Sequence, residues 1–222
     1  MNVFDIIGPI MIGPSSSHTA GAVRLGHIAN KVCDGRTPKE VEITLSGSFA
    51  RTYRGHGTDR ALLAGIMGYH SYDPEIRDAL EIAKERGIHY TFLKEDIPGA
   101  HPNTARIHCI YEDGEESVVE GASVGGGNIR VDLVNGMHVD FNGEFNTVLI
   151  LHQDLPGVIA DVTNYMRLVY PDVNICNFHL SRKEKGGEAL MTIEMEGPPP
   201  EGLTDGLRRL NNVINALIIR KI

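Results

Sequence analysis

Several features common in chains of this length are missing from these 222 residues. Tryptophan is absent, and aromatic residues make up only 6% of the chain. The formal net charge is −8, which argues against a nucleic-acid groove or an anionic membrane surface as the main partner. No apolar run approaches the ~20 residues that a membrane-spanning helix needs. Residues 1–10 have no basic segment and carry an acid in their apolar stretch, so we expect no signal peptide and a cytoplasmic location.

Cysteine is also scarce, and its three positions, Cys33, Cys109 and Cys176, are far apart in sequence. No C-x-x-C pair is present, so the chain has no motif for a zinc or iron–sulfur site. Cys109 and Cys176 lie in apolar, strand-like runs and are predicted to be core residues. The histidines are too scattered to give metal-ligand spacing. The sequence therefore predicts no metal site in this chain.

The pattern of residues changes near position 145, which predicts two domains, 1–145 and 146–222. The first segment holds all the Gly, Ser and His clusters and mixes helix and strand patterns, so we assign it to the α+β class without a strand order. The join at 140–146 is polar and contains a glycine, as a turn or short linker does. The second segment predicts the order β-α-β-β-α-β, the ferredoxin-like arrangement. Its elements are expected near 147–151, 158–169, 174–181, 189–195, 201–210 and 213–222.

The most informative stretch is residues 13–19, Gly-Pro-Ser-Ser-Ser-His-Thr, directly before a predicted helix. The first N–H groups of a helix lack internal partners and carry the positive end of its dipole. Ser15, Ser16, Ser17 and His18 are therefore suited to hold a small carboxylate or phosphate. The alternative is that these serines only cap the helix, although one serine suffices for that.

Three further clusters carry polar chemistry. After a strand over 41–45, residues 47–59 are expected to form a loop in which glycines bracket His56, and Thr58 or Asp59 is expected to cap a buried helix over 59–69. Residues 101–104 supply the amide of Asn103, and Gly125–Gly127 are expected to form a hairpin turn. Taken singly, each cluster has a structural explanation as a cap, a turn or a half-buried histidine. Together they offer dipoles for a carboxylate, hydroxyls and an amide for orientation, and imidazole for proton transfer, so we expect the turn at 13–19 to lie beside His56.

Over nearly its full length the chain resembles the β subunit of the two-chain, iron–sulfur-dependent L-serine dehydratases (L-serine ammonia-lyases). The resemblance rests on residues 13–19, Gly55–Asp59, His101–Asn103 and the C-terminal segment, which is similar to an ACT domain through Asp154, Pro156, Gly157 and Val158. It implies that L-serine is converted to pyruvate and ammonia. It also implies that His56, Thr58 and His18 are catalytic, that Ser15, Ser16, Ser17 and Asn103 contact substrate, and that the Asp154–Val158 turn binds an effector or serves assembly alone.

The resemblance further implies a [4Fe–4S] cluster. A cluster of this kind is held by cysteine thiolates, which this chain does not supply as a set, so we expect a separate α subunit to hold it. The ACT-like segment implies self-association. Two other functions stay open: a regulatory serine-binding module without catalysis, and a stand-alone Ser–His hydrolase. The hydrolase is disfavoured because no G-x-S-x-G setting surrounds the serines.

Overall fold

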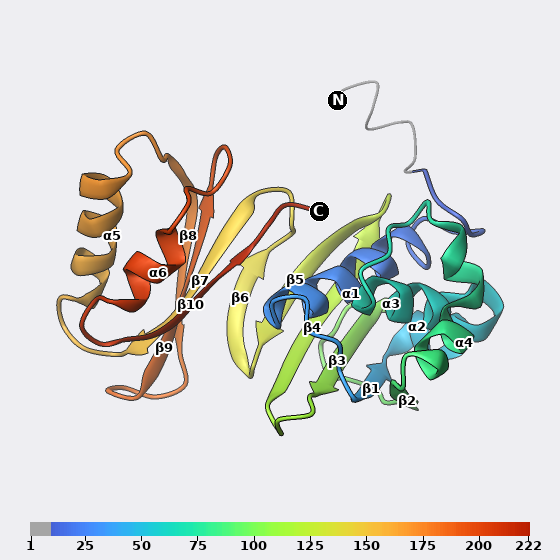
Figure 1. Ribbon diagram of the computed structural model, residues 1–222. Coiled ribbons are helices and arrows are strands. Elements are labelled where there is room, and N and C mark those ends of the chain that lie inside the picture. Colours follow the sequence, from blue (N-terminus) through green and yellow to red (C-terminus); the bar gives the residue numbers. More distant parts are fainter. Residues whose placement is uncertain (1–9) are drawn as a thin grey trace. The chain divides into compact units, whose positions relative to one another are not determined.

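The structure is a computed structural model that describes residues 10–222. The chain folds into two compact units, Met1–Asn135 and Gly136–Ile222 (Figure 1). Both units mix helices with a sheet, which confirms the predicted α+β class. The functional roles assigned to 1–145 and 146–222 stay predictions. The expectation about a signal peptide concerns residues that fall almost wholly outside the described part.

The first unit contains a sheet in the order β2-β1-β3-β4-β5. Strand β1 pairs in parallel with β2, and the remaining neighbours are antiparallel. Val41, Ile43 and Leu45 of β1 are buried whereas Glu42 is exposed, so the predicted alternation marks the face that carries the core. The strands are β1 (Glu40–Leu45), β2 (His89–Lys94), β3 (Thr104–Ile110), β4 (Glu116–Gly125) and β5 (Asn128–Val134).

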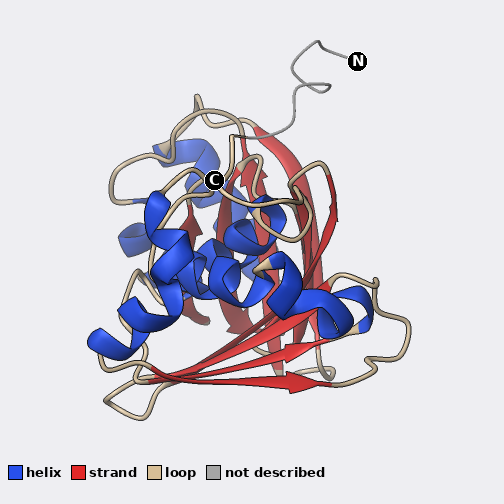
Figure 2. Ribbon diagram, turned by 90° about the vertical axis from the view of Figure 1, so that its right-hand side faces the viewer, coloured by secondary structure: helices blue, strands red, loops and turns tan. Residues whose placement is uncertain are grey.

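The helices of this unit cover one face of the sheet (Figures 1 and 2). Helix α1 packs on β4 and β5 with its apolar face, and α3 packs on α1. In α3 every residue except Arg60 is buried, which agrees with the apolar character of its sequence. The helical elements are α1 (Ala20–Val32), α2 (Gly47–His56), α3 (Thr58–Ile66), the 3-10 helix η2 (Pro74–Asp78) and α4 (Ala79–Glu85).

Helices α1 and α3 approach each other through glycine. A Cβ atom on Gly65 would lie 2.1 Å from the carbonyl oxygen of Val23 and 2.9 Å from the Cα atom of Gly26. A Cβ atom on Gly26 would lie 2.3 Å from the carbonyl oxygen of Leu62. Because these neighbours are backbone atoms, no side-chain rotation could make room. The two glycines therefore set how closely the helices pack.

The segment 47–56 is a helix, so the predicted loop there is wrong. The carbonyl of Pro102 accepts hydrogen bonds from the N–H groups of Ser48 (2.6 Å) and Phe49 (3.2 Å), which supplies partners for the first turn of α2. Gly57, at φ 71°, ends α2 and is also the N-cap of α3. A single left-handed residue thus joins the two helices, and neither Thr58 nor Asp59 is the predicted cap.

The second unit has a four-stranded sheet in the order β10-β7-β9-β8, with α5 and α6 on one face (Figure 1). With its element order this is the predicted ferredoxin-like arrangement. Val148, Ile150, Met191 and Ile193 form its core with Val162 and the neighbouring apolar residues of both helices. The elements are β7 (Asn146–Gln153), α5 (Val158–Val169), β8 (Ile175–Arg182), β9 (Glu188–Met195), α6 (Leu203–Arg208) and β10 (Val213–Ile219).

Two expectations about the second unit are wrong. Asp140 and Phe141 belong to strand β6 (Met137–Phe141), not to a linker, and β6 packs against β8 and β9. Cys176 is exposed on β8, an edge strand, whereas Cys109 is buried as predicted. Between residues 10 and 222 no helix combines the length and the apolar character needed to cross a bilayer.

Candidate active site

Two helix starts meet in the first unit, and each has a histidine two positions before it. His18 precedes α1, and His56, the last residue of α2, precedes α3. The two imidazole rings are 4.6 Å apart between centroids and nearly perpendicular, at 85°. The ring of Phe49 packs against His18 at 5.2 Å. The structure therefore brings the hydroxyl-rich turn and His56 together.

The serines before α1 do not cap it. Its N-cap is Thr19, which makes no side-chain capping bond. The Ser15 hydroxyl lies 3.3 Å from His18 Nδ1 and 3.4 Å from the His18 backbone nitrogen, so it serves the histidine. The N–H groups of Thr19 and Gly21 donate to the carbonyls of Ser15 and Ser16. Fewer N–H groups are thus free for an anion than the sequence suggested.

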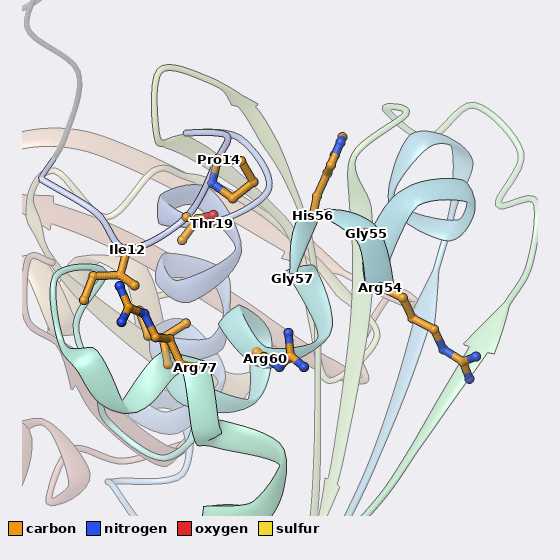
Figure 3. A pocket seen from close by; sticks show the side chains of 11 residues that line it. Ile12, Pro14, Thr19, Arg54, Gly55, His56, Gly57, Arg60 and Arg77 are labelled. Atoms are coloured by element: carbon orange, nitrogen blue, oxygen red, sulfur yellow. The ribbon is translucent and has the colours of Figure 1, made fainter.

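A cavity of about 300 Å³ opens beside this turn (Figure 3). Its volume is sufficient for a small amino acid. Gly13, Pro14, Thr19 and His56 contribute to its wall, whereas Ser15–His18 are not part of the lining. The complete lining consists of Ile12, Gly13, Pro14, Thr19, Arg54, Gly55, His56, Gly57, Arg60, Ile76 and Arg77.

Three arginines line this cavity, and the sequence analysis missed all of them. In Figure 3, Arg77 lies beside Ile12, near the turn that carries Thr19. Arg54 points away from the rest of the lining, and the direction of the His56 side chain differs from those of Arg54 and Arg77. Within residues 10–222, neither Arg60 nor Arg77 forms an ion pair. Their positive charge in a chain of net charge −8 favours an anionic ligand.

Several polar atoms at this site have no partner in the described part of the chain. They are Thr19 Oγ1, His56 Nδ1 and Thr58 Oγ1, and all three are buried. Thr58 itself is fully buried as the first residue of α3. Buried polar groups are normally hydrogen-bonded, so unpartnered ones at a cavity indicate groups that a ligand or a partner chain could satisfy.

Asn103 lies outside the cavity lining. It follows Pro102 at the N-terminal end of α2, whereas His56 is at the other end of this ten-residue helix, roughly 13 Å away by helix geometry. Its Nδ2 donates to the carbonyl of Ser123 at 3.4 Å, and Oδ1 is buried without a partner among the described residues. Asn103 does not line the cavity, so its contact with substrate stays a prediction.

The protonation of the histidine pair follows from its surroundings. Burial, and then the neighbouring His56, lower the pKa of His18 below its ordinary value of 6.5. In the unfolded chain His18 takes up a proton near pH 6.5, whereas in the fold it does so only at lower pH. Its neutral form therefore contributes stability that is complete above pH 6.5 and is lost as the pH falls toward the lowered pKa.

The cysteines do not fit an iron–sulfur cluster. Cys33 and Cys109 are buried in the first unit, where Cys33 Sγ donates to Ser117 Oγ at 2.8 Å. Burial raises the pKa of Cys109 to about 12, which keeps it a thiol. Cys176 belongs to the second unit. Among residues 10–222 no group of three His, Cys, Asp or Glu side chains is placed to hold a metal ion.

The Asp154–Val158 turn of the second unit joins β7 to α5. The Asp154 carboxylate accepts hydrogen bonds from the Gly186 N–H (2.9 Å) and the Arg182 guanidinium (2.7 Å), and these contacts lower its pKa. Asp154 thus holds the β8–β9 hairpin. Pro156 and Gly157 are exposed, and Val158 is a core residue. Effector binding at this turn stays a prediction.

Comparison with known proteins adds independent information. The family model described as "Serine dehydratase beta chain" matches residues 2–86. The chain is 42% identical to the "Probable L-serine dehydratase, beta chain" of Bacillus subtilis over 96% of its own length and 95% of that protein. It is 37% identical to the "L-serine dehydratase, beta chain" of Peptoniphilus asaccharolyticus, over 93% and 92% respectively. It is also 26% identical to the "D-3-phosphoglycerate dehydrogenase" of Bacillus subtilis, over 89% of this chain but 37% of that protein.

Proposed function

Because the chain belongs to the family of L-serine dehydratase β chains, we propose that it is the β subunit of an enzyme that converts L-serine to pyruvate and ammonia together with an α chain. The observation that carries this proposal is the pairing of His18 with His56 beside a cavity with arginines in its wall. A [4Fe–4S] cluster, which the residues of this chain do not fit, is assigned to the α chain, where it would supply a Lewis acid.

The reaction needs a base for the α-proton of serine and a proton for the departing hydroxyl. Loss of both as water gives aminoacrylate, and water then converts aminoacrylate to pyruvate and ammonia. His56 is the group of this chain assigned to proton transfer, since its Nδ1 has no partner among the described residues. Thr58, next to Gly57, is fully buried and lies outside the cavity lining, so its catalytic role stays a prediction. Both ring nitrogens of His18 have hydrogen-bond partners, Nδ1 in Ser15 and Nε2 in Thr52. His18 is therefore assigned an indirect role, in which it acts on the site through Ser15.

The arginines at the cavity are assigned to the carboxylate of serine. A guanidinium binds a carboxylate through two parallel N–H bonds, and charge-assisted bonds are about twice as strong as neutral ones. Arg77 and Arg60 are the candidates, because Arg54 points away from the rest of the lining (Figure 3).

Replacing Arg77 by glutamine is expected to raise the KM for L-serine about tenfold with little change in kcat, since a carboxylate contact is made equally in ground and transition states. Steady-state kinetics of the assembled enzyme measure this effect. Arg54→Gln is the matched control and is expected to change KM much less. An unchanged KM in Arg77→Gln would remove the carboxylate assignment.

The test of the proposed function is anaerobic co-expression of this chain with the α chain of the same organism. A brown complex that releases pyruvate from L-serine, when neither chain does so alone, is the expected result. An α chain that with its cluster intact turns over serine at the full rate by itself would contradict a shared active site.

For the second unit we propose self-association and effector binding. Strand β8 is an edge strand with Phe178 and Leu180 exposed at 39% and 37%. An apolar edge that pairs with no second strand among residues 10–222 supports pairing with another strand, as in a second copy of this unit. Leu155, 47% exposed in the Asp154–Val158 turn, supports a ligand or partner contact there.

A regulatory role is the second candidate. It is favoured by the similarity to a D-3-phosphoglycerate dehydrogenase, because nearly the whole of this chain matches about a third of a protein named for another reaction. Under this alternative the cavity binds serine as an effector. Loss of all turnover in His56 variants would decide against it, and altered cooperativity with unchanged maximal rate would support it.

A further inference from the structure

Thr52 connects His18 to helix α2. It lies one turn after Ser48 and one turn before His56, on the same face of the helix. Its Oγ1 is 2.8 Å from the backbone carbonyl oxygen of Ser48 and 3.1 Å from Nε2 of His18. A carbonyl can only accept, so the single hydroxyl proton of Thr52 is donated to Ser48. Toward His18, Thr52 therefore acts as an acceptor, and Nε2 must carry the hydrogen.

The protonation of Nδ1, the other ring nitrogen of His18, follows from this assignment. When His18 is neutral and Nε2 is protonated, Nδ1 is bare and accepts a hydrogen bond. The group in reach is the Ser15 hydroxyl, at 3.3 Å. Ser15 Oγ also lies 3.4 Å from the His18 backbone N–H, which donates to it. Hydrogen bonds thus run in one direction, from Ser15 through His18 and Thr52 to Ser48.

The surroundings favour this single arrangement. His18 is only 8% exposed, and its ring packs between Phe49 and His56, which restricts rotation. The titratable group that faces it is His56 from α2, and burial together with this neighbour favours the neutral form. For a neutral imidazole the tautomer decides which nitrogen is basic.

We propose that Thr52 is a positioning residue that fixes His18 in the tautomer with hydrogen on Nε2, so that the basic Nδ1 accepts a hydrogen bond from the Ser15 hydroxyl and fixes the turn before α1 that borders the cavity. The tautomer is a property of this chain's own residues. Only its consequence for turnover rests on the proposed function.

The test is nitrogen NMR of the full chain with isotope-labelled histidine, in which His18 is assigned from the signal lost in His18→Gln. The expected result at neutral pH is a protonated Nε2 and a bare Nδ1 in the wild type and in Thr52→Ser. In Thr52→Val, which keeps the shape but removes the acceptor, the population of that tautomer is expected to fall about tenfold relative to the alternative, as the loss of one hydrogen bond implies. Ser15→Ala is expected to keep the wild-type tautomer.

Turnover of the complex with the α chain gives the second readout. Thr52→Val is expected to lower kcat/KM about tenfold, with recovery in Thr52→Ser. Thr163→Val is the matched control, because Thr163 on α5 also donates to a carbonyl one turn earlier, that of Ile159 at 2.9 Å, and has no side-chain hydrogen bond to a histidine among residues 10–222. It is expected to leave both the His18 signals and the rate unchanged.

The outcomes separate the two proposals. A wild-type His18 with hydrogen on Nδ1, or a tautomer that Thr52→Val leaves unchanged in a folded protein, would overturn the role of Thr52 whatever the activity. If Thr52→Val does not fold, the spectra of the wild type, Thr52→Ser and Ser15→Ala still test the proposal, because all three are expected to carry the hydrogen on Nε2 of His18. The expected tautomers in a complex that releases no pyruvate would uphold the hydrogen-bond assignment and overturn the proposed reaction.

Discussion

Replacing His56 by alanine or asparagine is expected to lower kcat of the assembled enzyme by roughly 10²- to 10⁴-fold, the usual contribution of a positioned acid or base. The physical reason is that its Nδ1 has no partner among the described residues, whereas both nitrogens of His18 are engaged. Asparagine keeps polarity and approximate size but cannot transfer a proton. Pyruvate release under saturating L-serine measures the effect.

The control for this prediction is His89→Ala, the same change at an exposed position of β2 in the same unit. It is expected to retain the wild-type rate. Thermal unfolding followed by circular dichroism should show both variants folded, since His56 is only half-buried. Wild-type turnover in His56→Ala would show that the α chain supplies the acid and the base.

The second large effect is expected from Gly65→Ala. The added methyl group would meet three backbone atoms of α1, the carbonyl oxygen of Val23 at 2.1 Å and the Gly26 Cα and His27 nitrogen atoms at 2.9 Å each, so the helices must move apart. Overpacking a well-packed core usually costs about 1–3 kcal/mol, and because no side chain can yield here we expect about 3 kcal/mol or more. Denaturant unfolding of the full chain measures this change, and hydrogen exchange in α1 and α3 should rise with it.

Gly55→Ala is the matched control for stability. It lies in α2, and apart from its chain neighbours and the backbone of its own helix no atom would lie within 4 Å of an added methyl group, so alanine should stabilise the helix by roughly 0.5–1 kcal/mol. Equal stability of Gly65→Ala and the wild type would contradict the view that close backbone contact holds α1 on α3. Because His18 and His56 precede these helices, Gly65→Ala is also expected to lose turnover.

The sequence predicts well those elements in which apolar residues recur at a regular spacing because one face is buried and the other is exposed. Strands β1 and β3 alternate, and the whole β-α-β-β-α-β order of the second unit follows from simple periodicity and turn residues. Edge strand β2 was not predicted, because it is only partly buried and shows little contrast between its faces. Strand β6 was not predicted although Met137, Val139 and Phe141 alternate with exposed residues, because its last two residues were assigned to the polar join at 140–146.

Helix α2 was missed because three glycines, at 47, 55 and 57, suggest a loop. A usable signal was present: Ser48, Thr52 and His56 are spaced by four, which puts them on one helix face. The meeting of the hydroxyl-rich turn with His56 was predictable from their chemistry. Arg60 and Arg77 were not, since they reach the cavity only through the tertiary packing of α3 and η2.

The one-residue junction at Gly57 has a consequence for how this protein can vary in length. Adding a single residue there would turn α3 by about 100° relative to α2, which would carry Thr58 away from His56 and turn Arg60, the one exposed residue of α3, toward the core. Deleting one residue there would turn α3 by the same angle in the opposite direction. Hairpin tips such as residues 112–115 are exposed turns whose length does not set the rotation of a helix. Insertions and deletions among natural variants should therefore gather at those tips and spare the junction.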